Sequence, residues 1–451
     1  MKIWYWIKDR LTYVRIITIG YFLVTLLGTG LLLLPIATVP GKTTSFGTAL
    51  FTAASSTCVT GLMVVDPGTH FSIFGQSVLL VLIQIGGLGF VSVCVMLSLL
   101  LKKKITLKTR GLLQESMNGV QIGGIVKVVK LALLGTVLFE ILGTLMLAIK
   151  FVPMFGMGQG FFYSIFHSVS AFCNAGIEVF GSHFGEYPSL TGFRGDIPVN
   201  LIMIILTIVG GVGFFVWADL KQDKFHIKKC TLHTKMVLAM SSVLLIVGTV
   251  LYFLFERKNL FADMTGPEQV ITALFCSAMT RTTGFSVVDI AEFSNASKLL
   301  TIVLSFIGGS PGSTAGGIKT VTVFVLVLYI WSNLSGKRSV TVFKRRLDDE
   351  IIQKASNVLV LSLMLATGAC MLICFMQPQL DVLDVLIEVT SAIGTAGMST
   401  GITRDLGVGS RAIIIILMYC GRIGSMSFAL SVVNKKKEPP LKQPVEKIMI
   451  G

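Results

Sequence analysis

Charged residues are scarce in this chain of 451 residues: Asp, Glu, Lys and Arg together make up 14% of it, against 53% hydrophobic residues. A soluble domain carries about 25% charged residues, and the mean hydropathy of this chain is +0.81. The composition therefore excludes an ordinary soluble protein and predicts an integral membrane protein.

Patterns that carry catalysis or bind structural metals are also missing. The eight cysteines form no CxxC group, so we expect buried, reduced packing residues. The chain has no paired carboxylates and no Ser/His or metal-ligand constellation. The segment GGSPGSTAGGIKT differs from a phosphate-binding P-loop, because Ile318 separates Lys319 from the glycine that should precede it. We therefore predict that the protein is not an enzyme.

Long apolar runs are abundant instead. The net charge is +15, and Lys and Arg concentrate at the N-terminus, after every second apolar run and in the tail. By the positive-inside rule both termini are cytoplasmic, and no cleavable signal peptide is expected. This predicts a multi-pass cell-membrane protein and argues against nucleic-acid binding. Eight runs reach roughly 20 residues, the length that crosses a bilayer: 16–38, 73–101, 128–150, 198–219, 236–255, 299–331, 358–376 and 411–433.

One short glycine-bearing segment recurs four times, as TCVTGL, FCNAGI, RTTGF and GTAGM. A second signal, GGLG, GGVG, GGSPG and GRIG, follows each copy in step. The chain therefore divides into repeat 1 (1–120), repeat 2 (121–230), repeat 3 (231–345), repeat 4 (346–433) and a cytoplasmic tail (434–451). The key glycines are Gly61, Gly176, Gly284 and Gly397.

Each repeat reads as a helix, a short re-entrant helix, an exposed backbone turn and a second helix. The short segments, 45–56, 160–171, 267–280 and 381–393, are too short to cross a bilayer. Non-helical backbone at membrane depth is tolerated only where it is buried in protein or lines a watery cavity. We predict an all-α membrane fold in which four parallel helix–pore-helix–helix repeats surround a pseudo-fourfold pore, with eight transmembrane spans and four re-entrant half-helices.

The turn after each half-helix is predicted to expose carbonyl oxygens to a cation. Glycine permits positive φ and places no side chain in the lumen, and rings of backbone carbonyls replace the hydration shell in potassium filters. The expected cargo is K⁺, with Na⁺ as a second candidate, and no organic cofactor is expected. The predicted ion-binding residues are Thr60, Gly61, Ala175, Gly176, Thr283, Gly284, Ala396 and Gly397.

A gate is predicted below this filter, where glycine and proline interrupt the sixth run. Its residues are Gly308, Gly309, Ser310, Pro311, Gly312, Ser313, Thr314, Ala315, Gly316, Gly317 and Lys319, together with Arg422 in the eighth run. A buried Arg should face the bundle interior or water. Arg422 is either an electropositive barrier bound to carbonyls of the broken run or a packing ion pair with Glu140 or Glu388.

These motifs resemble the potassium transporters of the Trk/Ktr/HKT superfamily, and the chain looks most like the Ktr-type membrane subunit. The resemblance implies that the four glycines form the potassium filter and that 308–317 acts as an intramembrane gate. It also implies a homodimer seated on a cytosolic nucleotide-binding regulatory ring. In relatives that admit sodium, serine can replace the first glycine, so Gly61 favours potassium.

A second class of function stays open from the residues alone. A secondary transporter of another small solute or ion would place its site at two unwound half-helices, whereas four equivalent positions converge here. The sequence leaves open whether transport is channel-like or coupled to sodium, and it does not identify the regulatory subunit, its ligands or the function of the tail. Six acidic residues on the outer segments either enrich cations at the mouth or are solvated loop charges: Asp66, Glu178, Glu186, Asp196, Asp289 and Glu292.

Overall fold

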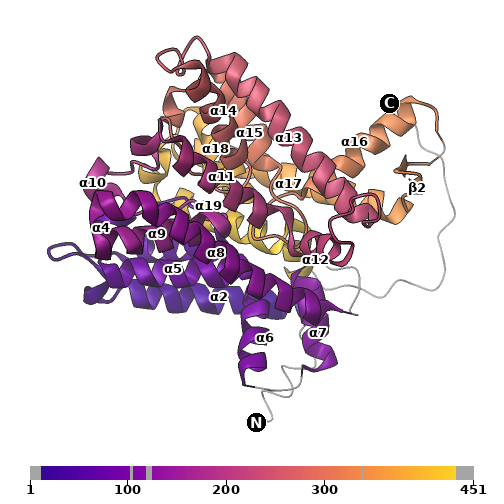
Figure 1. Ribbon diagram of the computed structural model, residues 1–451, viewed down its shortest axis with the longest axis horizontal. Helices are drawn as coiled ribbons and strands as arrows, with labels where there is room; N and C mark the ends of the chain where they lie inside the picture. Colours follow the sequence, from indigo (N-terminus) through magenta and orange to yellow (C-terminus); the bar gives the residue numbers. More distant parts are fainter. Residues whose placement is uncertain (1–11, 102–104, 118–123, 338, 433–451) are drawn as a thin grey trace.

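The computed structural model describes residues 12–101, 105–117, 124–337 and 339–432 (Figure 1). The predicted tail at 434–451 and the basic residues before residue 12 lie outside the described residues. Within these ranges, the helices that are long and apolar enough to cross a membrane number four, or up to six if two bent helix pairs each count as one span; the four are α2 (Tyr13–Leu32), α8 (Ile125–Phe155), α13 (Leu232–Glu256) and α17 (Asp349–Met376).

A shorter helix follows each of these long helices. The four short helices are α3 (Phe46–Cys58), α9 (Met157–Phe172), α14 (Gly266–Thr280) and α18 (Val382–Gly394). Their starts follow from capping chemistry. The Ser45 hydroxyl accepts from the Thr48 N–H, and the Asp381 carboxylate accepts from the Leu383 N–H. Thr265 and Glu268 form a reciprocal capping box at α14.

Small helices in the connectors join each short helix to an apolar helix pair, so the same order of long, short and paired helices recurs in four segments. The pairs are α5 (Ile73–Leu88) with α6 (Phe90–Leu100), α11 (Ile197–Val212) with α12 (Phe214–Gln222), α15 (Asn295–Phe306) with α16 (Thr320–Leu334) and α19 (Val408–Ile423) with α20 (Ser425–Val432). The connector helices are α4 (Pro67–His70), α10 (Gly181–Phe184), η2 (Thr191–Phe193), η3 (Ile290–Glu292) and η4 (Ile402–Arg404), whereas η1 (Pro35–Ala37) lies earlier, between α2 and α3.

The apolar runs at 73–101 and 198–219 each contain a sharp bend. The chain bends by 96° between α5 and α6 and by 87° between α11 and α12. The run at 411–433 is also interrupted, between α19 and α20. The glycine at each break has a positive φ that an α-helix does not allow: 83° at Gly89, 103° at Gly213 and 97° at Gly424.

Two further elements lie outside this pattern. Helix α7 (Leu107–Ser116) packs beside α6, and the two project from one edge of the bundle (Figure 1). Strands β1 (Thr341–Val342) and β2 (Arg345–Arg346) form a two-residue antiparallel hairpin beside α16. This hairpin is a small exception to the predicted all-α fold.

Burial separates the long helices from the short ones. Residues 51–60, 166–175, 275–283 and 387–396, at the ends of the short helices, are all buried. In contrast, only 28–33% of the apolar window of each long helix is buried. Large apolar side chains such as Leu27, Ile149 and Met371 are 70%, 79% and 72% exposed. The short helices therefore form the centre of the bundle, and the apolar exterior suits a lipid environment.

Candidate functional site

A tight turn follows each short helix and contains one of the predicted glycines. We call residues 59–61, 174–176, 282–284 and 395–397 the first to fourth glycine turns. In three of them the residue before the glycine donates its N–H, at 2.8 Å, to a carbonyl five residues earlier: Thr60 to Ser55, Ala175 to Ser170 and Ala396 to Ser391. The third turn continues its helix, since Thr283 donates to Met279, four residues earlier, at 2.9 Å.

The four turns meet in a closed ring. All four glycines have positive φ, from 65° at Gly176 to 93° at Gly61. A Cβ on each one would lie 2.5 Å or less from the carbonyl oxygen of the residue that precedes the next glycine. Following the chain, Gly61 faces the Ala175 carbonyl, Gly176 faces Thr283, Gly284 faces Ala396 and Gly397 faces Thr60.

We call the main-chain oxygens of Thr60, Ala175, Thr283 and Ala396 the carbonyl ring. The structure thus brings all eight predicted ion-binding residues together, although they come from segments more than 100 residues apart. No side chain larger than hydrogen fits at the glycine positions without displacing a carbonyl of the ring. The α-helices that end at the turns also direct their partially negative C-terminal ends toward them. Such an arrangement suits a desolvated cation.

A cavity of about 370 Å³ lies over the ring and is lined by all four glycines. We call it the mouth cavity. Two of the predicted outer acids, Glu178 and Asp289, line it, as does Arg404, whose guanidinium stacks over Tyr187 at 4.2 Å. Burial, with a smaller contribution from the Asp66 carboxylate, raises the pKa of Glu178 to about 8. Its carboxylate therefore changes charge near neutral pH.

The other outer acids have structural partners or lie elsewhere. Asp66 caps α4 through the Thr69 N–H at 2.9 Å, and burial raises its pKa. Asp196 caps α11 and pairs with Lys150 at 2.6 Å. Glu292 lies in η3 and is exposed. Of these acids, Glu178 and Asp289 line the mouth cavity, and Asp289 also caps η3 through the Ala291 N–H at 2.9 Å.

The predicted gate residues form a loop between α15 and α16, which we call the glycine-rich loop (307–319). Its two ends meet, because Ile307 and Ile318 pair as an isolated parallel bridge. Backbone hydrogen bonds attach the loop to the breaks of two other segments. Ser310 N–H donates to Gly211 at 3.1 Å, and Gly317 N–H donates to Gly421 at 3.2 Å.

One side of the loop contacts the glycine turns, and its other side lines a second cavity. Gly312, Ala315 and Lys319 line this second cavity, which measures about 40 Å³, and the Lys319 ammonium donates to the Ala315 carbonyl at 2.8 Å. A space of that size holds only a few water molecules. The cavity beside the loop is therefore narrow.

Arg422 lies in α19 next to this loop and donates to backbone carbonyls. Its Nη1 donates to Thr314 of the loop, and its Nη2 donates to Gly86 and to Gly87, the latter at 3.0 Å. The guanidinium thus joins the loop to the break after α5. None of the ion pairs within the described residues includes Arg422. The alternative of a packing ion pair with an acidic residue is therefore wrong.

The two acids considered for that pair have other partners. Glu140 of α8 accepts from Gln84 at 3.1 Å and from the Cys173 thiol at 3.8 Å, behind the second turn. Glu388 of α18 accepts from Ser399 and from Thr403, the latter at 2.9 Å. Both carboxylates therefore brace the surroundings of the glycine turns through neutral donors.

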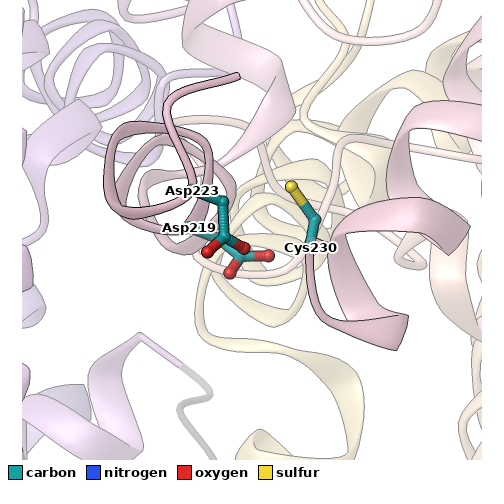
Figure 2. Close-up of side chains that lie close together, drawn as sticks. All are labelled: Asp219, Asp223 and Cys230. Atoms are coloured by element: carbon teal, nitrogen blue, oxygen red, sulfur yellow. The ribbon is translucent and has the colours of Figure 1, made fainter. Parts of the chain in front are cut away.

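A separate group of possible metal ligands lies far from the turns. Figure 2 shows the carboxylates of Asp219 and Asp223 next to each other and Cys230 on the facing segment, with ligand atoms within 4.8 Å of one another. Asp219 accepts from both the N–H and the hydroxyl of Thr231, at 2.8 and 2.9 Å. This carboxylate therefore anchors the start of α13, which accounts for its position without a metal.

Sequence reasoning missed two side chains of the site. Asn174 and Thr395 are fully buried and lie two residues before Gly176 and Gly397. Both hydrogen-bond to the glycine-rich loop, Asn174 through Thr314 and Thr395 through the Gly316 N–H. The sequence signal that could have indicated them is that each stands two residues before the key glycine of its repeat.

The fold and the site define the class of this protein as a helical membrane protein with a central site built from backbone carbonyls. The family model TrkH, a cation transport protein, matches residues 15–440. The chain belongs to this family of ion transporters, which are not enzymes. The predicted resemblance to the Trk/Ktr/HKT superfamily is thereby confirmed.

Full-length relatives and a solved structure agree with this assignment. The chain is 36% identical to the potassium/sodium uptake protein NtpJ of Enterococcus hirae over 99% of this chain and 98% of that protein. It is 37% identical to the Ktr system potassium uptake protein B of Bacillus subtilis, over 98% and 97% of the two chains. The potassium transporter TrkH from Vibrio parahaemolyticus has a similar fold, with a TM-score of 0.72 over 94% of this chain and 86% of that one, at 17% identity.

Proposed function

We propose that this protein takes up potassium across the cell membrane through the carbonyl ring. The observation that carries the proposal is the closed circuit in which each glycine lies against the carbonyl before the next glycine. Four oxygens from four segments can replace part of a cation's hydration shell. The names of the relatives, which specify potassium and, for one of them, sodium, support K⁺ as cargo with Na⁺ as competitor.

The glycine-rich loop acts as the gate in this proposal, with Arg422 as an electropositive barrier. The loop lies against the glycine turns, and the cavity that its residues line on the far side is small, about 40 Å³. The Arg422 hydrogen bonds to Thr314 and to the α5 break favour this closed position. Opening requires the loop to leave these partners, after which ions pass in a channel-like manner.

Eight membrane crossings in four parallel repeats would give the protein this pore, with the mouth cavity outside the cell and both termini in the cytoplasm. The recurring element order and the distribution of basic residues support this topology. In each repeat the helix pair would form the second crossing, broken at its glycine.

Flux measurements test the proposal most simply. The purified chain is reconstituted into proteoliposomes, and ⁸⁶Rb⁺ uptake is measured with K⁺ or Na⁺ as competitor. We expect K⁺ to compete at a far lower concentration than Na⁺. An imposed sodium gradient that leaves uptake unchanged supports the channel-like mechanism, and a gradient that drives uptake contradicts it. Equal competition by both ions, or no cation flux, would refute the carbonyl filter.

Assembly forms a second part of the proposal. We expect a homodimer that docks a cytosolic nucleotide-binding ring on its basic cytoplasmic face. The support is indirect: Lys and Arg cluster on the predicted cytoplasmic segments, and such a face favours an acidic partner whose binding weakens with salt. Purification in mild detergent should yield a membrane dimer with a bound soluble ring. Monomers alone by native mass spectrometry, with full nucleotide-independent activity, contradict this assembly.

A further inference from the structure

The residue two positions before the glycine differs between the four turns. In the first, second and fourth turns it is Val59, Asn174 and Thr395, with φ of 57°, 62° and 49°. A left-handed conformation is uncommon for non-glycine residues and is strained for β-branched ones. The surrounding structure must therefore hold these positions in place, and the contacts of Asn174 and Thr395 show how it does so.

Both polar residues receive a hydrogen bond from the glycine-rich loop. The Thr314 hydroxyl donates to the Asn174 side-chain oxygen at 2.9 Å, and the Gly316 N–H donates to the Thr395 hydroxyl at 2.9 Å. We call these two bonds the loop–turn contacts. Val59 has no polar atom with which to make an equivalent bond in the first turn.

Asn174 extends this connection to the third turn. Its side-chain amide donates to the Thr282 hydroxyl at 2.6 Å and to the Thr207 carbonyl at 3.3 Å. Thr283, whose carbonyl belongs to the ring, donates its hydroxyl to Thr207 at 3.3 Å. The loop is thus bonded directly to the second and fourth turns and, through Asn174, to the third.

All these groups are fully buried: Asn174, Thr282, Thr314 and Thr395 are 0 to 2% exposed. A buried polar group that loses its partner must find another or bear the cost of desolvation. When the loop moves away, Asn174 and Thr395 each lose the partner that the loop provides, and the left-handed backbone at two turns loses part of its support. Movement of the loop and order in the ring are therefore physically coupled.

We propose that Asn174 and Thr395 are positioning residues that tie the geometry of the carbonyl ring to the position of the loop. Ion preference is then highest while the loop contacts the turns, and it falls when the loop–turn contacts break. This inference rests on the proposed function, in which the turns are the filter and the loop is the gate. It adds that the two elements do not act independently.

The test uses variants that remove one hydroxyl each. Thr314→Val removes the bond to Asn174 from the loop side and leaves the glycine turns untouched. Thr395→Val removes the bond to Gly316, and Thr395→Ser keeps that hydroxyl. Thr249→Val is the matched control, because the Thr249 hydroxyl bonds only within α13, to Leu245 at 2.7 Å. Each full-length chain is assayed in proteoliposomes for ⁸⁶Rb⁺ flux and for competition by Na⁺.

We expect Thr314→Val and Thr395→Val each to raise flux and to lower the preference for Rb⁺ over Na⁺ by about three- to tenfold, the range expected for one hydrogen bond. Thr395→Ser and Thr249→Val should behave like the wild type. In an Asn174→Val background, Thr314→Val should have a much smaller effect than in the wild type, because the two residues share one bond and only the 3.2 Å contact of the Thr314 hydroxyl with the Phe172 carbonyl is still to be lost. Should Thr395→Val fail to fold, the Thr314 and Asn174 variants still decide the question.

Two outcomes separate this inference from the proposed function. If Thr314→Val raises flux while the ion preference stays at the wild-type value, the loop gates the pore without coupling to the filter, and the inference is overturned. If removing the loop changes neither flux nor preference, the gate itself is wrong and the inference falls with it. Additive effects of Asn174→Val and Thr314→Val would also overturn it.

Discussion

Replacing Gly176 by alanine places a methyl group against the carbonyl ring. A Cβ on Gly176 would overlap the Thr283 carbonyl oxygen, and the φ of 65° disfavours any side chain at this position. A left-handed residue costs about 1–2 kcal/mol, and overpacking adds about 1–3 kcal/mol. Backbone atoms meet on both sides of the overlap, so the strain is relieved only by displacing the Thr283 carbonyl.

Losing one of four carbonyls from the ring should weaken K⁺ binding more than Na⁺ binding, because the site is then less complete for the larger ion. A hydrogen bond to a charged group is worth about 1.5–3 kcal/mol. Taking that value for one carbonyl, we expect the preference for K⁺ over Na⁺ to fall by about ten- to a hundredfold. The assay is ⁸⁶Rb⁺ uptake into proteoliposomes with K⁺ and Na⁺ as competitors, on protein shown to be folded by gel filtration.

Gly368→Ala is the control for this variant. Gly368 lies inside α17, and a Cβ there meets no atom within 4 Å. This change should leave transport unaltered and stabilise the helix by up to about 1 kcal/mol. A folded Gly176→Ala protein with unaltered ion preference would refute the reasoning, because a displaced ring cannot keep the same selectivity.

Three further changes address other parts of the account. Gly61→Ser should reduce the preference for K⁺ over Na⁺ in a folded protein, seen as stronger sodium inhibition of Rb⁺ uptake; unchanged inhibition would exclude the first turn from the filter. Arg422→Ala, or deletion of several residues within 308–317, should raise flux at least several-fold, and a deletion that removes Thr314 and Gly316 should also lower the preference for Rb⁺ over Na⁺, because it breaks the loop–turn contacts; well-expressed variants with wild-type flux would exclude the gate. The raised pKa of Glu178, about 8, means that its carboxylate gains a proton as external pH falls below 8. The apparent KM for K⁺ should therefore rise between pH 9 and pH 6, because the cavity over the ring loses one negative charge. Glu178→Gln should remove this pH dependence, and its persistence would point to another group.

The sequence predicted the positions of the four turns well because their chemistry is local. A glycine after a short polar-apolar helix is visible in the chain, and the structure brings Gly61, Gly176, Gly284 and Gly397 together as one ring. The interruption of the sixth run was equally visible, since five glycines and a proline cannot continue a helix.

Other features depended on tertiary contacts that no local pattern reveals. The bends at Gly89 and Gly213 were not predicted from GGLG and GGVG, because glycine is common in membrane helices and the apolar run continues past these segments. Their positive φ is set by the way α6 and α12 pack. The bond between Asn174 and Thr314 joins residues 140 positions apart. The choice of Arg422 partners likewise became clear only once the loop and the α5 break were seen on either side of it.

The most direct test of the central claim is to locate the ion. Crystals of the protein grown in RbCl would be examined by anomalous diffraction at the rubidium edge. We predict an anomalous peak at the carbonyl ring, surrounded by the main-chain oxygens of Thr60, Ala175, Thr283 and Ala396. The peak should disappear when K⁺ is added, because K⁺ then replaces Rb⁺ and gives no anomalous signal at this edge. A peak elsewhere in the membrane-embedded part, with none at the ring, would contradict the account.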